Sequence, residues 1–271
     1  MNMKTPFCPT RRVPLVLALV PSPIVVDDLL VLTLDGVDHQ YLVALDKATG
    51  KTAWKRDRNI GYGTDNPDNK KAYSTPAVIA VNGHPQLVSP SAGATIAYVP
   101  KTGEEIWRVH SGGMNAAALP LFGHGLIYAT TAAGGYQLFA VRPDGRGDVT
   151  DTQVAWKFAK TVPSRSSPVL VDGRLFMISD NGMISCVDAK SGERVWQQRV
   201  DGAFSASPLV AGDRIYFFGE EGEIPVVAAA GEYRLLATNH LDDGFMASPA
   251  VFENSLILRS RKALYRIEKL P

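Results

Sequence analysis

The sequence predicts an all-β protein, specifically a β-propeller of four-stranded antiparallel blades. One phrase occurs three times, at residues 44–54, 97–107 and 186–196: a short apolar strand, a turn and a tryptophan. In each copy a glycine lies four residues before the tryptophan, and a threonine or serine comes directly before the glycine. Internal repeats on this scale are typical of propellers, solenoids and other repeat arrays.

A second marker, a Ser-Pro dipeptide or a close variant, sets the length of the repeating unit. Its prolines lie 40 to 53 residues apart, at Pro23, Pro76, Pro120, Pro168, Pro208 and Pro249. A period near 40 residues matches one four-stranded blade. We therefore predict six recognisable blades.

The fourth unit shows how the strands divide. The dipeptides Asp172-Gly173 and Asn181-Gly182 separate runs of apolar β-formers, and such dipeptides are strong hairpin signals. They predict strands at residues 168–171, 174–179, 183–188 and 193–200. No segment of the sequence shows sustained helical periodicity with capping residues, so we expect almost no helix.

The sixth unit is incomplete. Residues 264–267 are typical of a third strand, but no tryptophan follows them. Because an unpaired sheet edge is a template for unwanted pairing, we expect a fourth strand from elsewhere. The apolar run Val13–Val20 is the natural donor, although Pro14 and Pro21 fit a sheet ladder poorly. A truncated member with an open or strained ring is the alternative.

The domain organisation is simple. We expect residues 21–271 to form a single propeller domain and residues 1–20 to form an N-terminal segment ahead of it. This segment is either an ordinary structural segment, with Val13–Val20 as the closing strand, or a degenerate secretion signal, because Lys4 and Arg11 precede its apolar run. The run is too short to span a membrane.

The charge balance of the chain bears on its partners, and its cysteines bear on its core and its compartment. The chain has 28 basic and 27 acidic residues and no basic stripe, so nucleic acid is not an expected partner. The two cysteines are Cys8 and Cys186, and Cys186 takes the place of Ala44 and Ala97 in the other copies. We therefore expect Cys186 to be a small core residue. Two cysteines do not identify the compartment.

The repeated phrase resembles the repeat of PQQ-type β-propellers, named for the pyrroloquinoline quinone dehydrogenases. The resemblance is most complete at residues 44–54. Longer passages at residues 166–176, 203–218 and 242–251 resemble the PQQ-binding-like repeat proteins of planctomycete-type bacteria, and residues 142–152 are similar to an insertion in that group. Such chains usually have eight blades, so the resemblance also allows a truncated eight-bladed ring. It implies a periplasmic or otherwise exported protein; a cytoplasmic protein is the alternative if no signal is cleaved.

The resemblance does not extend to the quinone chemistry. Quinoprotein dehydrogenases hold PQQ over a tryptophan floor beside a calcium ion, and many have adjacent paired cysteines. This sequence has no adjacent cysteine pair, and its four tryptophans occupy the docking position of the repeat: Trp54, Trp107, Trp156 and Trp196. We therefore expect no bound PQQ or Ca²⁺ and no enzymatic activity, with a quinoprotein-type oxidoreductase as the alternative.

Other chemistry-bearing patterns are weak. The five histidines show no metal-binding spacing, and there is no nucleophile elbow. Acidic loops at residues 65–69 and 144–151 could gather oxygen ligands for Ca²⁺. Asp and Asn also cap turns, and we favour that interpretation over a metal site for both loops.

The candidate binding site lies where the loops of a propeller meet. The loops that lead into the first strand of each blade, and those that join the second and third strands, share one face around the central channel. The first set supplies Lys71, Tyr73, Asn115, Arg165, Phe204, Ser205, Phe245 and Met246, and the second supplies Asp180, Asn181, Glu220 and Glu221. Aromatic, arginine and amide groups suit a recognition surface. The alternative is that Phe204, Phe245 and Met246 fill the channel as packing.

These observations favour a non-catalytic scaffold that binds a protein, a peptide or another ligand through the loop face. The long loop Arg56–Ser74 is the best candidate to overhang that face. The outer-membrane assembly lipoproteins of Gram-negative bacteria use a PQQ-type propeller as a protein scaffold, which supports this hypothesis by analogy. A structural fragment of a longer propeller protein is a further alternative.

Overall fold

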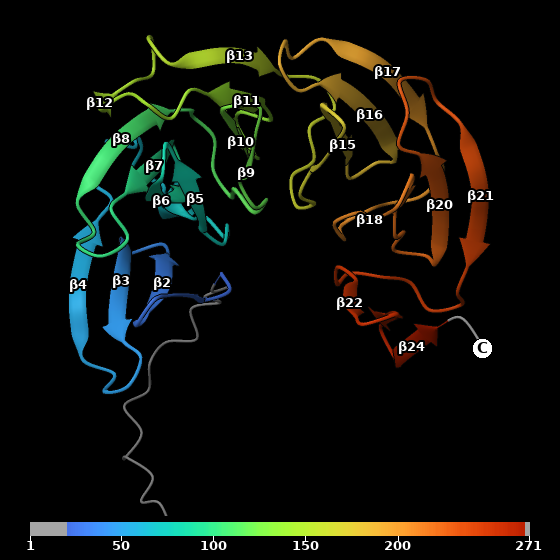
Figure 1. Cartoon of the computed structure of the whole chain (residues 1–271), viewed down its shortest axis with the longest axis horizontal. Helices are drawn as coiled ribbons and strands as arrows, with labels where there is room; N and C mark the ends of the chain where they lie inside the picture. The colour runs from blue at the N-terminus through green and yellow to red at the C-terminus, as the bar shows by residue number, and fades with distance from the viewer. Residues whose placement is uncertain (1–20, 269–271) are drawn as a thin grey trace, which may run out of the picture.

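The computed structural model describes residues 21–268, and the proposed closing strand Val13–Val20 lies outside them. Six sheets follow one another along an arc, and their strands are antiparallel apart from one short parallel pair, so the chain is an all-β propeller as predicted. The single helical segment in the described range is the short 3-10 helix η1 (Pro67–Lys70). The first and last blades stand at opposite ends of the arc and are not side by side (Figure 1).

The first three blades have these strands. Blade 1 comprises β1 (Ile24–Val26), β2 (Leu29–Asp35), β3 (Gln40–Asp46) and β4 (Thr52–Asp57). Blade 2 comprises β5 (Ala77–Val81), β6 (His84–Pro90), β7 (Ala94–Tyr98) and β8 (Glu105–His110). Blade 3 comprises β9 (Leu121–Gly123), β10 (Leu126–Thr130), β11 (Leu138–Val141) and β13 (Val154–Phe158). The first strand of each blade lies towards the centre and the fourth lies on the rim (Figure 1).

The last three blades follow the same plan. Blade 4 comprises β14 (Val169–Val171), β15 (Arg174–Ile178), β16 (Met183–Asp188) and β17 (Arg194–Arg199). Blade 5 comprises β18 (Leu209–Ala211), β19 (Arg214–Tyr216), β20 (Glu223–Ala228) and β21 (Leu235–His240). Blade 6 has only three strands, β22 (Ala250–Phe252), β23 (Ser255–Arg259) and β24 (Leu264–Glu268), so its third strand is confirmed. The strands expected for the fourth unit match β14–β17 to within one residue at each end.

The sequence did not predict one strand. β12 (Gly147–Asp148) lies in the insertion at residues 142–152 and pairs in parallel with β8, which makes the sheet of blade 2 five-stranded. Thr150 Oγ1 also accepts a hydrogen bond from the His110 amide at 2.9 Å. The insertion therefore clamps blade 3 onto the rim of blade 2.

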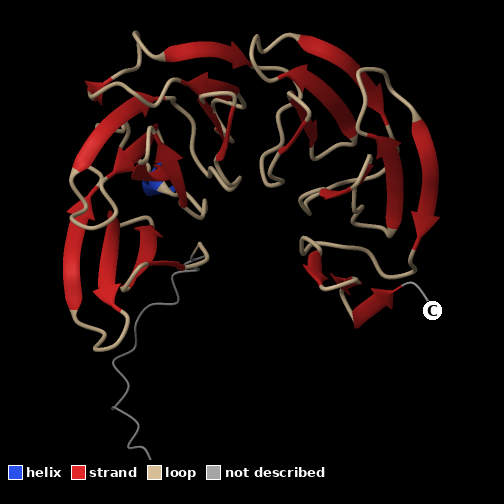
Figure 2. Ribbon diagram, viewed as in Figure 1, coloured by secondary structure: helices blue, strands red, loops and turns tan. Residues whose placement is uncertain are grey.

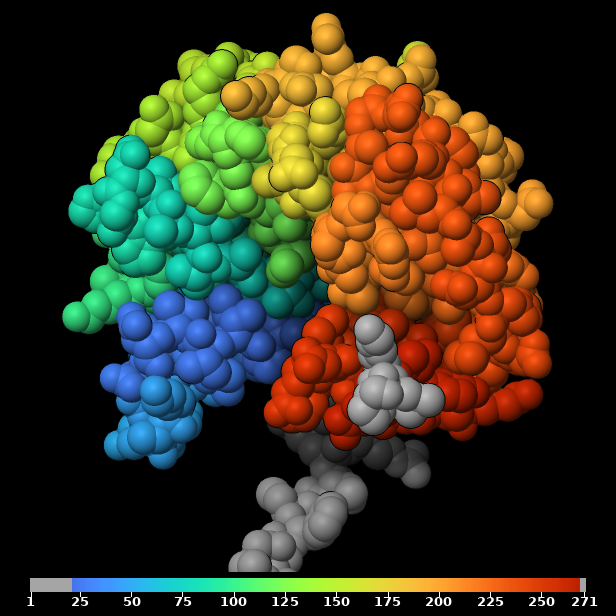
Figure 3. All heavy atoms as spheres, turned by 45° about the vertical axis from the view of Figure 1, so that its right-hand side comes forward, coloured from blue at the N-terminus to red at the C-terminus, as the bar shows by residue number. Residues whose placement is uncertain are grey.

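The hydrophobic core consists of clusters between successive blades. On the surface the blades follow one another in chain order (Figure 3). Cys186 belongs to the cluster between blades 4 and 5 and is completely buried, as expected for a small core residue. Burial raises the pKa of its thiol to about 12, so the thiol is not a reactive one.

Each tryptophan joins its own blade to the next one. The Nε1–H groups of Trp54, Trp156 and Trp196 donate to backbone carbonyls of the following blade at 3.0, 3.2 and 3.0 Å. Trp107 makes the same link indirectly: it donates to Gln86 Oε1 at 2.8 Å, and Gln86 Nε2 donates to the Pro143 carbonyl of blade 3 at 3.0 Å.

The Ser-Pro marker has a similar role on the inner side of the arc. The backbone N–H groups of Leu119, Ser167 and Ser207 each donate to the serine hydroxyl of the next marker, all at 2.9 Å. The Ser22 amide donates in the same way to Thr75 Oγ1 at 3.0 Å. The repeated hydroxyl is therefore an acceptor that ties the inner strands together.

Candidate functional site

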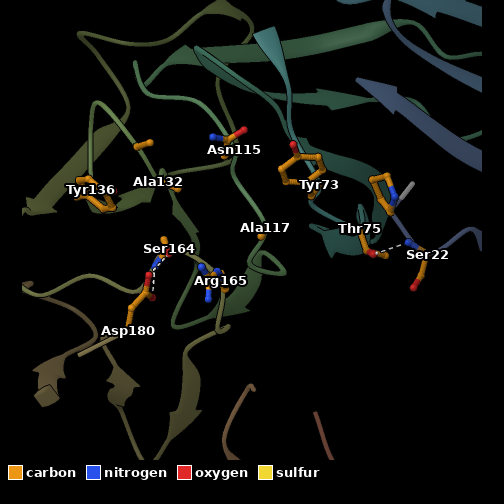
Figure 4. Close-up of a pocket in the computed structure, with 12 residues that line it drawn as sticks. Ser22, Tyr73, Thr75, Asn115, Ala117, Ala132, Tyr136, Ser164, Arg165 and Asp180 are labelled. Atoms are coloured by element: carbon orange, nitrogen blue, oxygen red, sulfur yellow. Dashed lines mark hydrogen bonds between the residues drawn. The ribbon is translucent and has the colours of Figure 1, made fainter. Parts of the chain in front are cut away.

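A pocket of about 650 Å³ lies on the loop face of blades 1 to 4. We call it the mouth pocket (Figure 4). It is lined by Pro21, Ser22, Tyr73, Thr75, Asn115, Ala117, Ala132, Ala133, Tyr136, Ser164, Arg165 and Asp180. The structure therefore brings together four of the predicted site residues: Tyr73, Asn115, Arg165 and Asp180.

Hydrogen bonds between adjacent loops hold two of these residues in place. The Tyr73 amide donates to the Ala116 carbonyl at 2.7 Å, and the Asn115 amide donates to the Lys71 carbonyl at 2.8 Å. Asn115 has a left-handed backbone (φ 57°), a conformation that Asn adopts more readily than most residues. The loops that lead into blades 2 and 3 are thus fixed to each other, which makes this wall of the pocket preorganised.

Arg165 connects the pocket to the neighbouring blade. Its Nη1 donates to Ser205 Oγ at 2.7 Å, and Ser205 in turn donates to Glu220. Arg165 and Glu220 also form an ion pair at 3.5 Å. The Arg165 side chain remains 57% exposed, so it can contact a ligand while this network orients its guanidinium group.

Asp180 is also engaged within the protein. Its carboxylate accepts hydrogen bonds from the Ser164 amide at 3.0 Å and from the Ser164 hydroxyl. In Figure 4 these bonds appear as dashed lines on the same side of the pocket as Arg165. The wall of the pocket therefore carries one partly exposed cationic side chain, Arg165, and its one acidic side chain, Asp180, is already hydrogen-bonded.

Two predicted site residues need correction. Phe204 and Phe245 are completely buried, Phe204 in the cluster between blades 4 and 5 and Phe245 in the cluster between blades 5 and 6. Phe245 packs edge-on against Phe218, with ring centroids 5.6 Å apart. These two phenylalanines are core packing and are not accessible to a partner, whereas Met246 is 53% exposed.

The other predicted residues do not line the mouth pocket. Lys71 forms an ion pair with Asp68 at 2.7 Å, and this hydrogen bond raises the pKa of Lys71. Glu221 pairs with Arg261 of blade 6 at 3.5 Å. Asn181 accepts a hydrogen bond from the Ser179 hydroxyl at 2.6 Å, which stabilises its own hairpin.

Sequence reasoning missed Tyr136, an aromatic side chain on the wall of the pocket. It follows Gly134-Gly135 in the hairpin between β10 and β11 and is 49% exposed. The pair of glycines before an aromatic residue was the available signal, because it predicts a loop longer than those of the other blades. With Tyr73, it gives the mouth pocket two aromatic groups on opposite sides (Figure 4).

The long loop Arg56–Ser74 begins with a buried charge. Arg58 is 1% exposed and bonds Asp35 of blade 1 through Nε and Nη2, at 3.0 and 2.7 Å. Its Nη2 also donates to Ser89 Oγ of blade 2 at 2.9 Å. Burial disfavours the charge of Arg58, but the adjacent Asp35 carboxylate outweighs that effect and raises the pKa of Arg58. Farther along, Tyr62 and Asn69 help to line a second, smaller pocket of about 400 Å³.

In the two acidic loops, Asp and Asn side chains cap turns by accepting hydrogen bonds from nearby backbone amides. The Asp148 carboxylate accepts hydrogen bonds from the Thr150 hydroxyl and amide, which lower the pKa of Asp148. Asn66 caps η1 by accepting from the Asp68 amide at 3.1 Å. Within residues 21–268, no group of three or more His, Cys, Asp or Glu side chains is placed to hold a metal ion.

The residues present do not fit PQQ. All four tryptophans are engaged between blades, and the lining of the mouth pocket contains none. Asp180, the one acid in the lining of the pocket, is already held by Ser164, and Glu220 is held by Arg165 and Ser205. The pocket therefore has neither a flat aromatic floor nor a set of carboxylates for the accompanying cation.

The repeated four-stranded blades and their tryptophan links define a PQQ-type β-propeller. The sequence matches the profile of the family described as outer membrane protein assembly factor BamB over residues 38–148 and 145–244, and the chain belongs to this family. In the part of the chain that the structure describes, no helix is long and apolar enough to cross a membrane.

Two relatives illustrate the similarity in sequence. The outer membrane protein assembly factor BamB of Legionella pneumophila (strain Paris) is 26% identical over 210 residues, which is 77% of this chain and 50% of the relative. The BamB of Moranella endobia (strain PCIT) is 26% identical over 197 residues, covering 67% and 48% of the two chains. The chain thus spans about half the length of these curated relatives.

Two solved structures share the fold. The crystal structure of BamB from Moraxella catarrhalis superposes with a TM-score of 0.67 at 15% identity, covering 89% of this chain and 67% of that one. The quinohemoprotein alcohol dehydrogenase of Comamonas testosteroni gives a TM-score of 0.58 at 12% identity, covering 83% and 44%. At these identities the similarity concerns the fold alone.

Proposed function

We propose that this chain is a non-catalytic scaffold that binds a segment of another protein in the mouth pocket. The observation that carries this proposal is the pocket itself, in which Tyr73, Tyr136 and Arg165 extend from loops that hydrogen bonds hold in place. Aromatic and arginine side chains supply most of the energy in protein interfaces, and preorganised loops reduce the entropy lost on binding.

The family supports the proposal in its broad outline. The relatives are named as assembly factors for outer membrane proteins, and an assembly factor has to contact other proteins. On this basis we propose that the chain acts in an exported, periplasmic setting on partners of that kind. The fold alone favours no reaction, because one fold carries many functions.

We also propose that PQQ takes no part in this function. Each indole that could form a floor for the quinone instead links two blades, so removing one for cofactor binding would weaken the arc. The fold shared with the alcohol dehydrogenase is therefore compatible with a protein that has no redox centre.

Titration of a captured partner with variants of the pocket tests the proposal. Tyr73→Ala, Tyr136→Ala and Arg165→Ala should each weaken binding by about 2 kcal/mol or more, with the melting temperature nearly unchanged. Leu236→Ala is the matched control, because Leu236 is 41% exposed on the rim strand β21. Unchanged affinity in all three pocket variants would move the binding surface elsewhere.

A further inference from the structure

The junction between blades 5 and 6 is built differently from the junctions before it. In blades 1 to 4, a small residue on the third strand pairs with a tryptophan on the rim strand: Ala44 with Trp54, Ala97 with Trp107, Ala140 with Trp156 and Cys186 with Trp196. In blade 5 the corresponding pair is Val226 and Ala237. The rim strand of blade 5 therefore brings no indole to this position.

An aromatic ring on the second strand packs against this indole in blades 3 and 4. The ring centroids of Tyr128 and Trp156 lie 5.9 Å apart, and those of Phe176 and Trp196 also lie 5.9 Å apart. Tyr216 holds the same position in blade 5, because it has the same cross-strand register. Among the described residues, no aromatic ring packs against Tyr216. Tyr216 thus lacks the ring that the repeat places beside it.

A groove of about 600 Å³ lies between blades 5 and 6, which are neighbours in the arc (Figure 1). We call it the junction groove. Its walls are mostly apolar, and they include Leu209, Tyr216 and Phe218 of blade 5 and Val251, Leu256 and Ile267 of blade 6. An apolar cavity of about 150 Å³ can bind benzene, so the junction groove has room for a larger aromatic molecule.

The blade 6 wall of the junction groove is incompletely covered by blade 5. Val251 is 62% exposed and Ile267 is 47% exposed, although both line the groove. Val187 and Val227 correspond to Ile267 in blades 4 and 5, and both are completely buried. An apolar concave surface with a few polar groups is typical of a small-molecule site.

Three polar side chains at the border of the groove are free to bind a ligand. Asn239 lies on β21, and Glu253 and Asn254 lie in the hairpin between β22 and β23. Within residues 21–268 these side chains form no hydrogen bond. Each has an oxygen that can accept a ring N–H. His240 also lines the groove, but two carboxylates already contact its ring nitrogens at 2.8 and 2.9 Å.

We propose that the junction groove binds a small heteroaromatic molecule that has a ring N–H and is about the size of indole. Its ring would pack against Tyr216, in the place that the rim tryptophan takes in blades 3 and 4. Its N–H would be donated to one of the free oxygens at the border. Because aromatic pairs add to the energy of apolar burial, an aromatic ligand should bind more tightly than an aliphatic one of similar size. The junction groove shares no lining residue with the mouth pocket, so this proposal does not depend on the proposed function.

Titration with indole tests the proposal. By calorimetry or ligand-observed NMR we expect a Kd below about 1 mM for the original chain. Cyclohexylmethanol, an aliphatic alcohol of similar size, should bind about fivefold more weakly, and Tyr216→Leu should weaken indole binding by about the same factor. Absence of indole binding, or equal affinity for the two compounds, would overturn the proposal.

A variant that rebuilds the missing pair locates the site. Val226→Ala with Ala237→Trp restores the small residue and the tryptophan of blades 1 to 4, so its own indole should occupy the groove and added indole should no longer bind. The matched control is Val226→Ala with Thr238→Trp, because Thr238 is exposed on the opposite face of β21 and should leave the affinity unchanged. The same indole affinity in both variants would place the site elsewhere and overturn the proposal.

The melting temperature shows whether the rebuilt variant is folded, and we expect it to be no lower than that of its control. If the rebuilt variant melts earlier, Tyr216→Leu decides in its place. An unchanged indole affinity in Tyr216→Leu would then overturn the proposal, and a fall of about fivefold would support it.

Discussion

Arg58 and Asp35 form a two-bond ion pair that is buried between blades 1 and 2. The bonds are 3.0 and 2.7 Å long, and both side chains are almost completely enclosed. Arg58 begins the long loop after β4, so the pair fixes the start of that loop to the core. It also joins two blades, through the further bond from Arg58 to Ser89.

Removing one partner of this pair should destabilise the protein strongly. Arg58→Ala leaves the Asp35 carboxylate buried without its cation, and we expect a loss of about 3–5 kcal/mol in the free energy of unfolding. The double variant Arg58→Met with Asp35→Leu should recover much of that loss, because it buries no charge. Denaturant titration measures both. A single variant within about 0.5 kcal/mol of the wild type would contradict the role given to the pair.

The relay from Trp107 through Gln86 to blade 3 should be sensitive to small changes. Trp107 is completely buried, so Trp107→Ala should cost about 3–5 kcal/mol. Trp107→Phe keeps most of the ring but leaves Gln86 Oε1 without its donor, and we expect about 1–3 kcal/mol. Reversible urea unfolding of the two variants measures both losses. If Trp107→Ala costs less than about 1 kcal/mol, the tryptophan does not hold the blades together.

Much of the fold was predictable because each blade repeats the same local signals. The hairpin dipeptides placed the strands of blade 4, and the shortened sixth unit predicted the three strands of blade 6. The repeat also identified Trp54, Trp107, Trp156 and Trp196 as docking residues, although it did not say whether each docks on its own blade or on a neighbour. The structure assigns them to the next blade along the chain.

The candidate site was predictable only in part, because surface position depends on packing between blades. Phe204 and Phe245 follow the loop pattern of the other site residues, but they turn into the core, where burial of a large ring is favourable. In the sequence Arg58 is one of many charged residues in loops, and only the structure shows that Asp35 lies beside it. β12 is two residues long and has no sequence pattern of its own. The place of Tyr136 on the pocket wall depends on the conformation of a single hairpin, the one between β10 and β11.

Acid should destabilise the turns of the repeat. Hydrogen bonds to the Asp188 carboxylate from the Ser191 and Lys190 amides lower its pKa below the ordinary value of 3.8, and Asp46 behaves similarly beside Thr49. A lowered pKa in the folded state adds stability above the unfolded pKa, and this stability is lost as pH falls through the folded value. The melting temperature of the protein should therefore decrease when the pH is lowered below about 4.

Asparagine variants check the origin of this acid sensitivity. Asp188→Asn keeps a carbonyl acceptor but cannot be protonated, so it should flatten part of the decline in melting temperature between pH 4 and pH 2.5. Asp201→Asn is the control, because no hydrogen bond to the Asp201 side chain is formed within the described residues. Equal pH profiles for the two variants would exclude the turn carboxylate as the cause.

Exposure to PQQ should leave the protein without bound quinone. The indoles are engaged between blades and the pocket acids are paired, so we expect no retained absorbance after incubation with PQQ and Ca²⁺ and gel filtration. A chain that retains about one quinone and oxidises an alcohol with a dye acceptor would be an enzyme, contrary to our expectation.

Site-specific photo-crosslinking in the native host tests the central claim most directly. A photoreactive phenylalanine analogue at Tyr136 places the probe in the mouth pocket, and the same analogue at Leu236 places it on the rim of blade 5 at similar exposure. We expect the Tyr136 probe to capture one defined polypeptide, with loss of the crosslink when Arg165→Ala is added, and the Leu236 probe to capture none. Capture of the same polypeptide from Leu236 and not from Tyr136 would show that the scaffold binds its partner on the rim and that the mouth pocket is not the binding site.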